Sequence, residues 1–314
     1  MSTPEVNPDV QLNGTPSACC DIEEAFYTAA DGMSIYGCIH PVSAPRGVVL
    51  MMHGLGEHSG RYGHVIHCFQ EKNLAVVRFD WRGHGRSDGK RGYAKSYRFL
   101  MNDLSMMLQV TLKRFPGVPV ILFGHSLGGN FVANWILRRP VEAAHVRGAI
   151  LSSPWFTLTK KPSLIKVGVI RSLAFLWPSL LIPAGFRPRK LTRNPTAIAA
   201  YEHDPLIHKN ASVRLVCDAY FAGLWALQHA AECQLPILAL HGTADSVTSP
   251  EGTELFCQRA PHADLILFEN LVHEPHNEPE WRIVVEEMRS WILRLLENRT
   301  ETSVMIPGKT STEI

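Results

Sequence analysis

Residues 118–130 read Val-Pro-Val-Ile-Leu-Phe-Gly-His-Ser-Leu-Gly-Gly-Asn, and this stretch decides the fold. An apolar run ends in Gly124-His125-Ser126-Leu127-Gly128, and a segment compatible with a helix follows at once, at 130–138. A G-x-S-x-G pattern between a strand and a helix predicts a sharp turn that holds its serine in a strained conformation. The two glycines let the flanking segments pass close to each other. The sequence therefore predicts Ser126 as an exposed nucleophile, with the Leu127 N–H beside it as a donor to an oxyanion.

Short apolar runs recur along the chain with the spacing of strands in a parallel sheet. Each is rich in Val, Ile and Leu and is bounded by turn residues, as expected for strands covered on both faces. They cover 47–53, 75–80, 118–124, 147–152, 235–241 and 264–269, with helical patterns at 97–115, 251–259 and 280–296. Residues 24–30 and 34–40 predict an antiparallel hairpin. This order predicts a mostly parallel, doubly wound α/β sheet.

Length and composition agree with one sizeable enzyme domain. The 314 residues can bury a large core, and 46% hydrophobic and 19% charged residues are typical of a globular protein. The formal net charge is +2 and the basic residues are scattered, which argues against a nucleic-acid partner. The seven cysteines are odd in number and show no metal-ligand spacing. Together with the lack of a secretory signal at the start, these cysteines predict a cytoplasmic protein with reduced thiols.

One segment interrupts the alternation of strands and helices. Residues 156–219 show no strand of the same kind; they contain helical patterns at 164–171 and 172–186, followed by a stretch rich in Pro, Arg and Lys at 187–195. We interpret 156–219 as an inserted helical cap. The α/β core is then formed by 21–155 and 220–298, and 1–20 and 299–314 are expected to be flexible tails.

The apolar part of this cap segment has two interpretations. Residues 172–186 carry no charge, but fifteen residues with two prolines are too short and too broken to span a bilayer. They form either an ordinary core helix or an exposed lid that contacts lipid surfaces, which makes the protein peripheral to membranes. The flanking basic residues favour the lid; these are Lys160, Lys161, Lys166 and Arg171.

A serine nucleophile requires a base and an acid that orients the base, and position relative to the strands selects both. His273 lies in the loop after the last strand, and Asp245 lies in the loop after the strand before it. The chain order Ser126, Asp245, His273 is the order expected on an α/β-hydrolase sheet. His273 takes the serine proton in this scheme, and Asp245 fixes the tautomer of its ring. His276 is the alternative base, whereas Asp264 precedes its strand and is rejected.

The second oxyanion donor is expected in the turn after an earlier strand. His53-Gly54-Leu55-Gly56 follows the first parallel strand and has the HG-type pattern of oxyanion loops, which assigns this donor to the Leu55 N–H. The alternative is a turn that merely ends the strand. The polar residues of the next turn are expected to brace this loop rather than to catalyse; they are Asp80, Arg82, His84 and Arg86.

Three motifs together resemble the monoacylglycerol lipase and lysophospholipase group of α/β-hydrolases. They are His53-Gly54-Leu55-Gly56-Glu57-His58-Ser59-Gly60-Arg61-Tyr62, Asp80-Trp81-Arg82-Gly83-His84-Gly85-Arg86-Ser87-Asp88-Gly89 and Gly124-His125-Ser126-Leu127-Gly128-Gly129. The similarity spans 24–297 and is weak in the cap. It implies an α/β-hydrolase fold, a lipid-ester substrate, no cofactor and no metal. It also implies the triad and oxyanion donors named above, and a pocket for the glycerol-like end of the substrate lined by Glu57, Arg61, His125, Tyr201 and His276.

The residues alone leave alternatives for these pocket positions. Glu57 and Arg61 are four residues apart, so an ion pair on a helix explains them without a ligand, and His125 fits a packed core equally well. The function we expect is a serine carboxylester hydrolase for monoacylglycerols or lysophospholipids that works through an acyl-enzyme. The alternatives are a short-chain or xenobiotic esterase, an acyltransferase or a peptidase of the same fold, and a lipid-binding protein on a hydrolase scaffold. The oligomeric state is left open.

Overall fold

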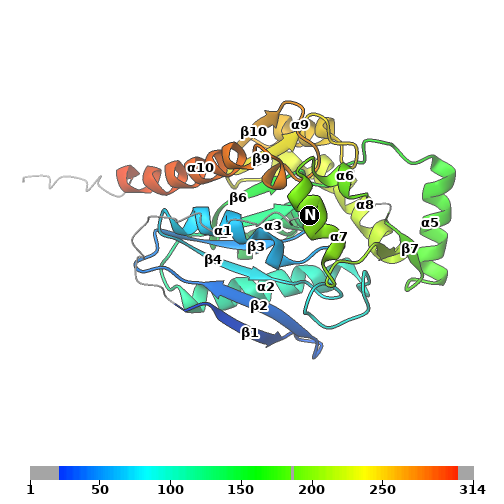
Figure 1. Cartoon of the computed structure of the whole chain (residues 1–314), viewed down its shortest axis with the longest axis horizontal. Coiled ribbons are helices and arrows are strands. Elements are labelled where there is room, and N and C mark those ends of the chain that lie inside the picture. Colours follow the sequence, from blue (N-terminus) through cyan, green and yellow to red (C-terminus); the bar gives the residue numbers. More distant parts are fainter. Residues whose placement is uncertain (1–20, 185–186, 303–314) are drawn as a thin grey trace, which may run out of the picture.

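The computed structural model describes residues 21–184 and 187–302, with side chains up to residue 297 (Figure 1). The expected flexible tail at 1–20 lies outside the described residues. So does the expected tail at 299–314, apart from 299–302, which end helix α10 (Trp281–Thr302).

An eight-stranded sheet in the order β1-β2-β4-β3-β5-β6-β9-β10 forms the centre of the molecule. The strands are β1 (Glu23–Thr28), β2 (Ser34–His40), β3 (Gly47–Met52), β4 (Leu74–Phe79), β5 (Val120–His125), β6 (Val146–Ser152), β9 (Ile237–Gly242) and β10 (Ala263–Phe268). β2 pairs antiparallel with β1 and β4, and the other neighbours are parallel. The predicted hairpin and parallel strands are confirmed, each to within two residues at either end.

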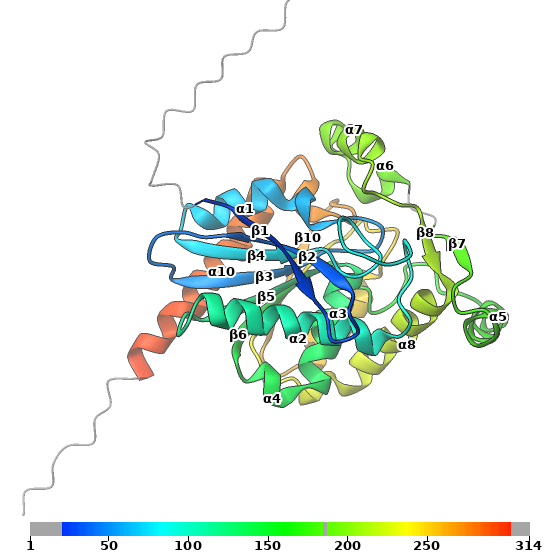
Figure 2. The same cartoon turned by 90° about the horizontal axis from the view of Figure 1, so that it is seen from below.

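Helices cover both faces of the sheet, because successive strand residues point to opposite sides. In β3, Leu50 and Met52 belong to one buried cluster, while Val49 and Met51 belong to the other. The helices α2 (Tyr97–Arg114), α3 (Leu127–Arg138), α8 (Val213–His229) and α9 (Pro250–Arg259) contribute to the first cluster; α1 (Gly63–Gln70) and α10 contribute to the second. Figure 2 shows α2, α3 and α8 on one side of the sheet and α1 on the other.

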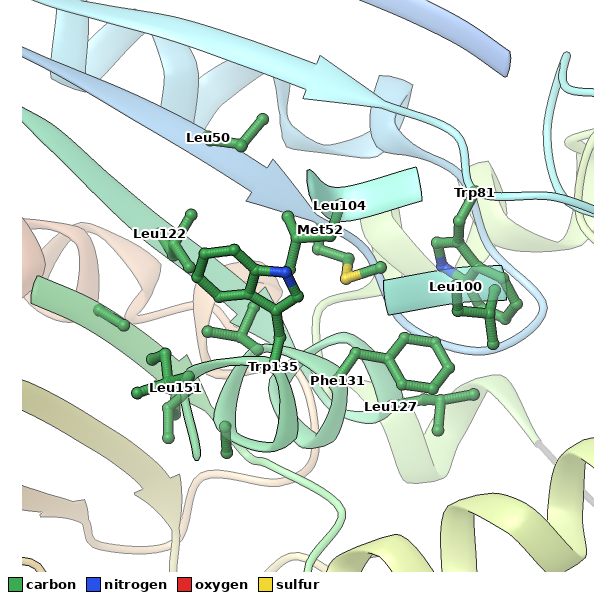
Figure 3. Packing of buried hydrophobic residues seen from close by; sticks show 14 of the residues in the cluster. Leu50, Met52, Trp81, Leu100, Leu104, Leu122, Leu127, Phe131, Trp135 and Leu151 are labelled. Carbon is green, nitrogen blue, oxygen red and sulfur yellow. The ribbon is translucent and has the colours of Figure 1, made fainter. Parts of the chain in front are cut away.

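Large side chains fix α3 against the sheet, and α3 begins directly after Ser126. Phe131 and Trp135 are fully buried, and Figure 3 shows them among Leu122, Met52 and Leu104, from β5, β3 and α2. Truncating a buried aromatic side chain of this size typically costs about 3–5 kcal/mol. The start of α3 is therefore held at the carboxyl end of β5.

The predicted cap segment (residues 156–219) differs from expectation in detail. The two helices expected at 164–171 and 172–186 are wrong: one helix, α5 (Leu164–Leu176), crosses that boundary and ends where Pro178 prevents its continuation. A short antiparallel pair follows, β7 (Leu181–Pro183) with β8 (Asn210–Ser212), in a region where no strand was expected. Two short helices lie between them, α6 (Pro188–Leu191) and α7 (Pro195–His203).

Exposure decides between the two interpretations of the apolar stretch. Leu164 is 89% exposed, Phe175 85% and Leu176 75%, and Ala174 is the one buried residue of α5. Figure 1 shows α5 at the periphery of the molecule, away from the sheet. The interpretation as an ordinary core helix is therefore wrong. Among the described helices, none is long and apolar enough to cross a membrane.

Helix α8 connects this segment to the core, so the boundary placed at residue 219 falls inside a helix. Its first half packs against α5 and its second half against α3. A Cβ at Gly223 would lie 2.3 Å from the carbonyl oxygen of Phe156, so only glycine fits there. The Nδ2 groups of Asn130 and Asn134 donate to the Ala219 and Ala222 carbonyls at 3.0 and 3.1 Å. The second half of α8 thus belongs to the core.

Candidate active site

Ser126 occupies the sharp turn between β5 and α3. Its φ is 52°, a left-handed conformation that costs a serine about 1–3 kcal/mol. Hydrogen bonds hold it there: the Ser126 N–H donates to Ser152 at 2.9 Å, and its carbonyl accepts from Asn130 and Trp155, each at 3.0 Å. A Cβ at Gly128 would lie 2.4 Å from the Met52 carbonyl oxygen, which shows why the motif needs that glycine.

The structure brings Ser126, His273 and Asp245 together from three loops. His273 Nε2 lies 2.9 Å from Ser126 Oγ, and His273 Nδ1 lies 2.7 Å from Asp245 Oδ2. All three residues are buried. This is the geometry in which a histidine can take a proton from a serine while a carboxylate orients its ring.

The charges of the pair suit that chemistry. Burial opposes the ionisation of Asp245, but His273 and a hydrogen bond from His241 outweigh it and hold the pKa of Asp245 well below its usual range. Burial alone would lower the pKa of His273, but Asp245 outweighs burial and raises that pKa above 6.5. His273 is therefore a stronger base than an ordinary histidine, and it lies beside the serine.

Sequence reasoning missed the residues that hold Asp245. His241 Nε2 lies 3.0 Å from Asp245 Oδ2, and Thr248 Oγ1 donates to the same oxygen at 2.9 Å. The N–H groups of Val247 and Thr248 donate to Oδ1 at 2.7 and 3.2 Å. His241 stands at the end of β9, four residues before Asp245, so its position in His-Gly-Thr-Ala-Asp was the available signal.

Leu55 and Leu127 lie where the oxyanion donors were expected. Leu127 is the first residue of α3, and Leu55 lines the same cavity as Ser126. Within the described part of the chain, neither N–H has a hydrogen-bond partner. The neighbouring Gly54 N–H is instead taken by Glu57 Oε1 at 2.6 Å. Both leucine amides are therefore free to donate to an oxygen atom placed beside Ser126.

The turn after β4 braces the Leu55 loop, as expected from the sequence. The Trp81 N–H and indole N–H donate to His53 Nε2 and to its carbonyl, at 3.3 and 3.2 Å. Asp80 Oδ1 accepts from the N–H and hydroxyl of Ser59 at 2.8 and 2.6 Å. The expectation is wrong for two of the four residues, because Arg82 pairs with Asp103 and Asp31, and Arg86 pairs with Glu24.

A small cavity lies beside Ser126, and three of the five expected pocket residues line it. These three are Glu57, His125 and Tyr201. The other residues that line the cavity with Ser126 are Gly54, Leu55, Leu191, His273 and Glu274. Arg61 and His276 are not among these lining residues. Arg61 lies behind Glu57 and Glu274, and the buried ring of His276 packs against His125 and Tyr62, with centroid distances of 4.7 and 4.9 Å.

The ion pair between Glu57 and Arg61 is present but does not lie on an α-helix. Arg61 belongs to the 3-10 helix η1 (Ser59–Tyr62), and Glu57 precedes it. Glu57 Oε1 also accepts from the Tyr62 hydroxyl at 2.8 Å. Arg61 makes a second, bidentate pair with Glu274 at 2.8 and 2.7 Å. Glu274, which sequence reasoning missed, directly follows His273, and that adjacency was its one sequence signal.

Both neighbouring histidines are neutral at physiological pH. Burial lowers the pKa of His125 to about 4 and that of His276 well below 6.5. His276 forms no hydrogen bond to Ser126 or Asp245, and neither ring nitrogen has a partner among the described residues. The geometry therefore favours His273 over His276 as the base.

An apolar groove lies between α5 and α8, next to Trp155. Its walls are largely aliphatic and aromatic; they include Trp155, Leu158, Val167, Ile170, Val216 and Phe221. The Trp155 N–H donates to the Ser126 carbonyl at 3.0 Å, while the other residues that line this groove lie outside the lining of the cavity beside Ser126.

Comparison with known proteins identifies the family. A sequence model of the Hydrolase_4 family, described as serine aminopeptidase, S33, matches residues 43–280. The chain belongs to this family, and it is a serine hydrolase. It is 32% identical over 274 residues to the monoacylglycerol lipase of Mycolicibacterium smegmatis, covering 86% of this chain and 96% of that protein. It is 30% identical over 271 residues to the monoglyceride lipase of Rattus norvegicus, covering 84% of this chain and 88% of that protein.

Solved structures agree with the fold. The monoacylglycerol lipase of Paleococcus ferrophilus superposes with a TM-score of 0.76 at 32% identity, covering 83% of this chain and 99% of that chain. A soluble variant of monoglyceride lipase from Saccharomyces cerevisiae, in complex with a substrate analog, gives a TM-score of 0.80 at 22% identity; it covers 89% of this chain and 97% of that chain. The predicted α/β-hydrolase fold and the resemblance to monoacylglycerol lipases are confirmed.

Proposed function

We propose that the chain hydrolyses monoacylglycerols, with Ser126 as nucleophile, His273 as base and Asp245 as the acid that orients it. The observation that carries this proposal is the hydrogen-bonded chain Ser126–His273–Asp245, with Ser126 and His273 in the lining of a polar cavity. The lipase relatives support the glyceride substrate.

The reaction follows from the geometry. His273 Nε2 accepts the Ser126 proton as Oγ attacks the ester carbonyl, and the Leu55 and Leu127 N–H groups donate to the oxyanion that forms. The tetrahedral intermediate collapses to an acyl-enzyme, and His273 returns the proton to the departing glycerol oxygen. Water then attacks the acyl-enzyme, with His273 again as base, and releases the fatty acid.

In this proposal the two ends of the substrate lie in different surroundings. The acyl chain occupies the apolar groove, where burial stabilises it by about 0.8 kcal/mol for each CH₂ group. The glycerol end lies at the polar cavity, whose lining includes Glu57, His125 and Tyr201. Arg61 and His276 support this wall from behind.

Helix α5 supplies contact with the lipid surface in this proposal. Its exposed face carries Leu164, Ile165, Phe175 and Leu176, and the exposed Trp177 follows directly. Exposed apolar patches of this kind, flanked by lysines, are typical of segments that insert into a membrane interface. The enzyme then draws its single-chain substrate from the bilayer to which α5 is bound.

A fluorophosphonate probe and a panel of substrates test the proposal. We expect Ser126 to be labelled, and we expect monoacylglycerols to be cleaved with a higher kcat/KM than p-nitrophenyl acetate or aminoacyl p-nitroanilides. The matched control is Ser105→Ala, at a hydroxyl that accepts from Trp135 and Arg139 and does not line the cavity; it should keep full labelling. Preference for the anilides would make the chain a peptidase, and an unlabelled wild type would make it a binding protein.

A further inference from the structure

The cavity beside Ser126 has an acidic wall. Its described lining includes two carboxylates, Glu57 and Glu274, and neither Lys nor Arg. Both glutamates are nearly inaccessible, at 3% and 2% exposure. Burial opposes their ionisation, but Arg61 outweighs it and holds the pKa of each below its ordinary value, so both are charged.

The guanidinium of Arg61 pairs with both carboxylates. Arg61 uses Nη1 and Nη2 for the bidentate pair with Glu274, and Nη1 also binds Glu57 Oε2. Two carboxylates and one guanidinium leave a net charge of −1 in this cluster. The planar fork through which arginine normally binds a phosphate or carboxylate is therefore already filled by Glu274.

Glu274 is held firmly in this position. Asn277 Nδ2 donates to Glu274 Oε2 at 2.7 Å, and the Glu274 N–H donates to the Leu191 carbonyl at 2.7 Å. The 3-10 helix η3 (Pro275–Asn277) follows at once. An anion entering the cavity would have to displace a carboxylate that backbone and side chain both fix, in surroundings of low dielectric constant where repulsion is strong.

We propose that Glu274 is a specificity-determining residue that restricts the leaving group to uncharged alcohols and excludes anionic ones such as a glycerol phosphate. The inference rests on the proposed ester hydrolysis and deepens it. The uncharged glycerol end of a monoacylglycerol meets no like charge at this wall, whereas the phosphate of a lysophospholipid would lie beside two carboxylates. Like charges brought together at a binding site discriminate by repulsion rather than by added contacts.

Two matched substrate pairs test this role. The first is 1-acylglycerol against 1-acylglycerol 3-phosphate with the same acyl chain, which differ only at the phosphate. The second is a p-nitrophenyl ester against the ester of a carboxylated nitrophenol with the same acyl chain. We expect the uncharged member of each pair to have the higher kcat/KM by at least about tenfold in the wild type. Glu274→Gln should narrow both ratios by about tenfold, because it removes one negative charge.

Glu280→Gln is the control, since its exposed carboxylate pairs with Arg193 outside the cavity, and it should leave both ratios unchanged. If Glu274→Gln does not fold, Glu57→Gln removes the other carboxylate and should narrow the ratios in the same direction. Equal kcat/KM within both pairs in the wild type, or ratios that neither variant alters, would overturn the role of Glu274. Discrimination between the nitrophenyl esters without cleavage of either acylglycerol would overturn the proposed function and leave this inference standing.

Discussion

The turn around Ser126 and helix α5 are the two extremes of this molecule. In the turn, the backbone N–H and carbonyl of Ser126 are hydrogen-bonded, the flanking glycines contact other backbone atoms, and the surrounding residues are buried. In α5, most side chains face solvent, and a Cβ at Gly168 would have nothing within 4 Å. Many contacts hold the Ser126 turn in its conformation, whereas few hold helix α5 in place.

This difference separates chemistry from access. A strained backbone such as that of Ser126 persists only where its surroundings determine it many times over, and the proton transfers need that accuracy. A helix with few buried contacts can shift at little cost, which suits a segment that meets a lipid surface. Substitutions in the turn should therefore affect every substrate equally, while substitutions on the exposed face of α5, away from the groove, should affect only substrates held in a membrane.

The largest effect is expected at Ser126. Ser126→Ala should lower kcat by at least about three orders of magnitude on every ester, because the nucleophile is lost while the oxyanion donors remain. The thermal unfolding midpoint should stay within about 2 °C, since alanine occupies the same turn without a larger side chain. Labelling by a fluorophosphonate and kcat on two esters measure this. If the loss of kcat in Ser126→Ala differed between the two esters, the turn would not control the chemistry of every substrate, and its proposed difference from α5 would be wrong.

The second effect concerns pH. Asp245 raises the pKa of His273 above 6.5, and the base must be neutral, so kcat/KM should fall about tenfold per pH unit below that pKa and level off above it. Asp245→Asn removes the cause of the increase, so the midpoint of the profile should move to lower pH while kcat drops by about 10⁴-fold. A pH profile of wild type and variant on a soluble ester checks both.

His276 provides the matched control for that profile. Its ring is buried, and burial lowers its pKa well below 6.5, in the direction opposite to the shift of His273. His276→Ala should alter KM through the cavity next to Tyr62 and His125, but the midpoint of the pH profile should not move. A shift of the midpoint in His276→Ala, with none in Asp245→Asn, would assign the base to His276.

The third effect compares two glycines, one in each kind of surroundings. Gly223→Ala places a Cβ 2.3 Å from the Phe156 carbonyl and should destabilise the fold by about 1–3 kcal/mol. Gly168→Ala adds the same methyl group to open space in α5 and should stabilise that helix by up to about 1 kcal/mol. Chemical denaturation of both variants measures the difference. Equal effects would mean that α8 is no more tightly fixed to the core than α5 is.

The same division explains what the sequence could predict. The strands were found because each is a short apolar run that the sheet buries on both faces, and the triad followed from its position after them. The second predicted cap helix, at 172–186, is wrong because Pro178 and Pro183 interrupt it. Few buried contacts are present there to hold the segment in a helix in spite of the prolines. Glu274 was missed because its partner Arg61 lies 213 positions away, and no local spacing reports such a pair. Long-range pairs formed only by the fold have no periodic signal.

The smallest effect, and the most selective, is expected in α5 and the turn after it. Leu176 is 75% exposed, so Leu176→Glu should leave stability and the hydrolysis of a soluble short-chain ester nearly unchanged. Hydrolysis of monoacylglycerol in anionic vesicles should fall several-fold, because a charge on the exposed apolar face opposes insertion into the interface. The measurement is the ratio of the two rates, in vesicles and in solution.

Leu180 is the control, four positions further along the same segment. Its side chain packs against Ala174, Val213 and Cys217, and its carbonyl accepts from the Val213 N–H at 2.9 Å. Leu180→Glu should therefore destabilise the fold and lower both rates together, since a charge is buried without a partner. If Leu176→Glu also lowered both rates in parallel, α5 would be part of the packed core in solution, and the proposed contact with lipid would lose its support.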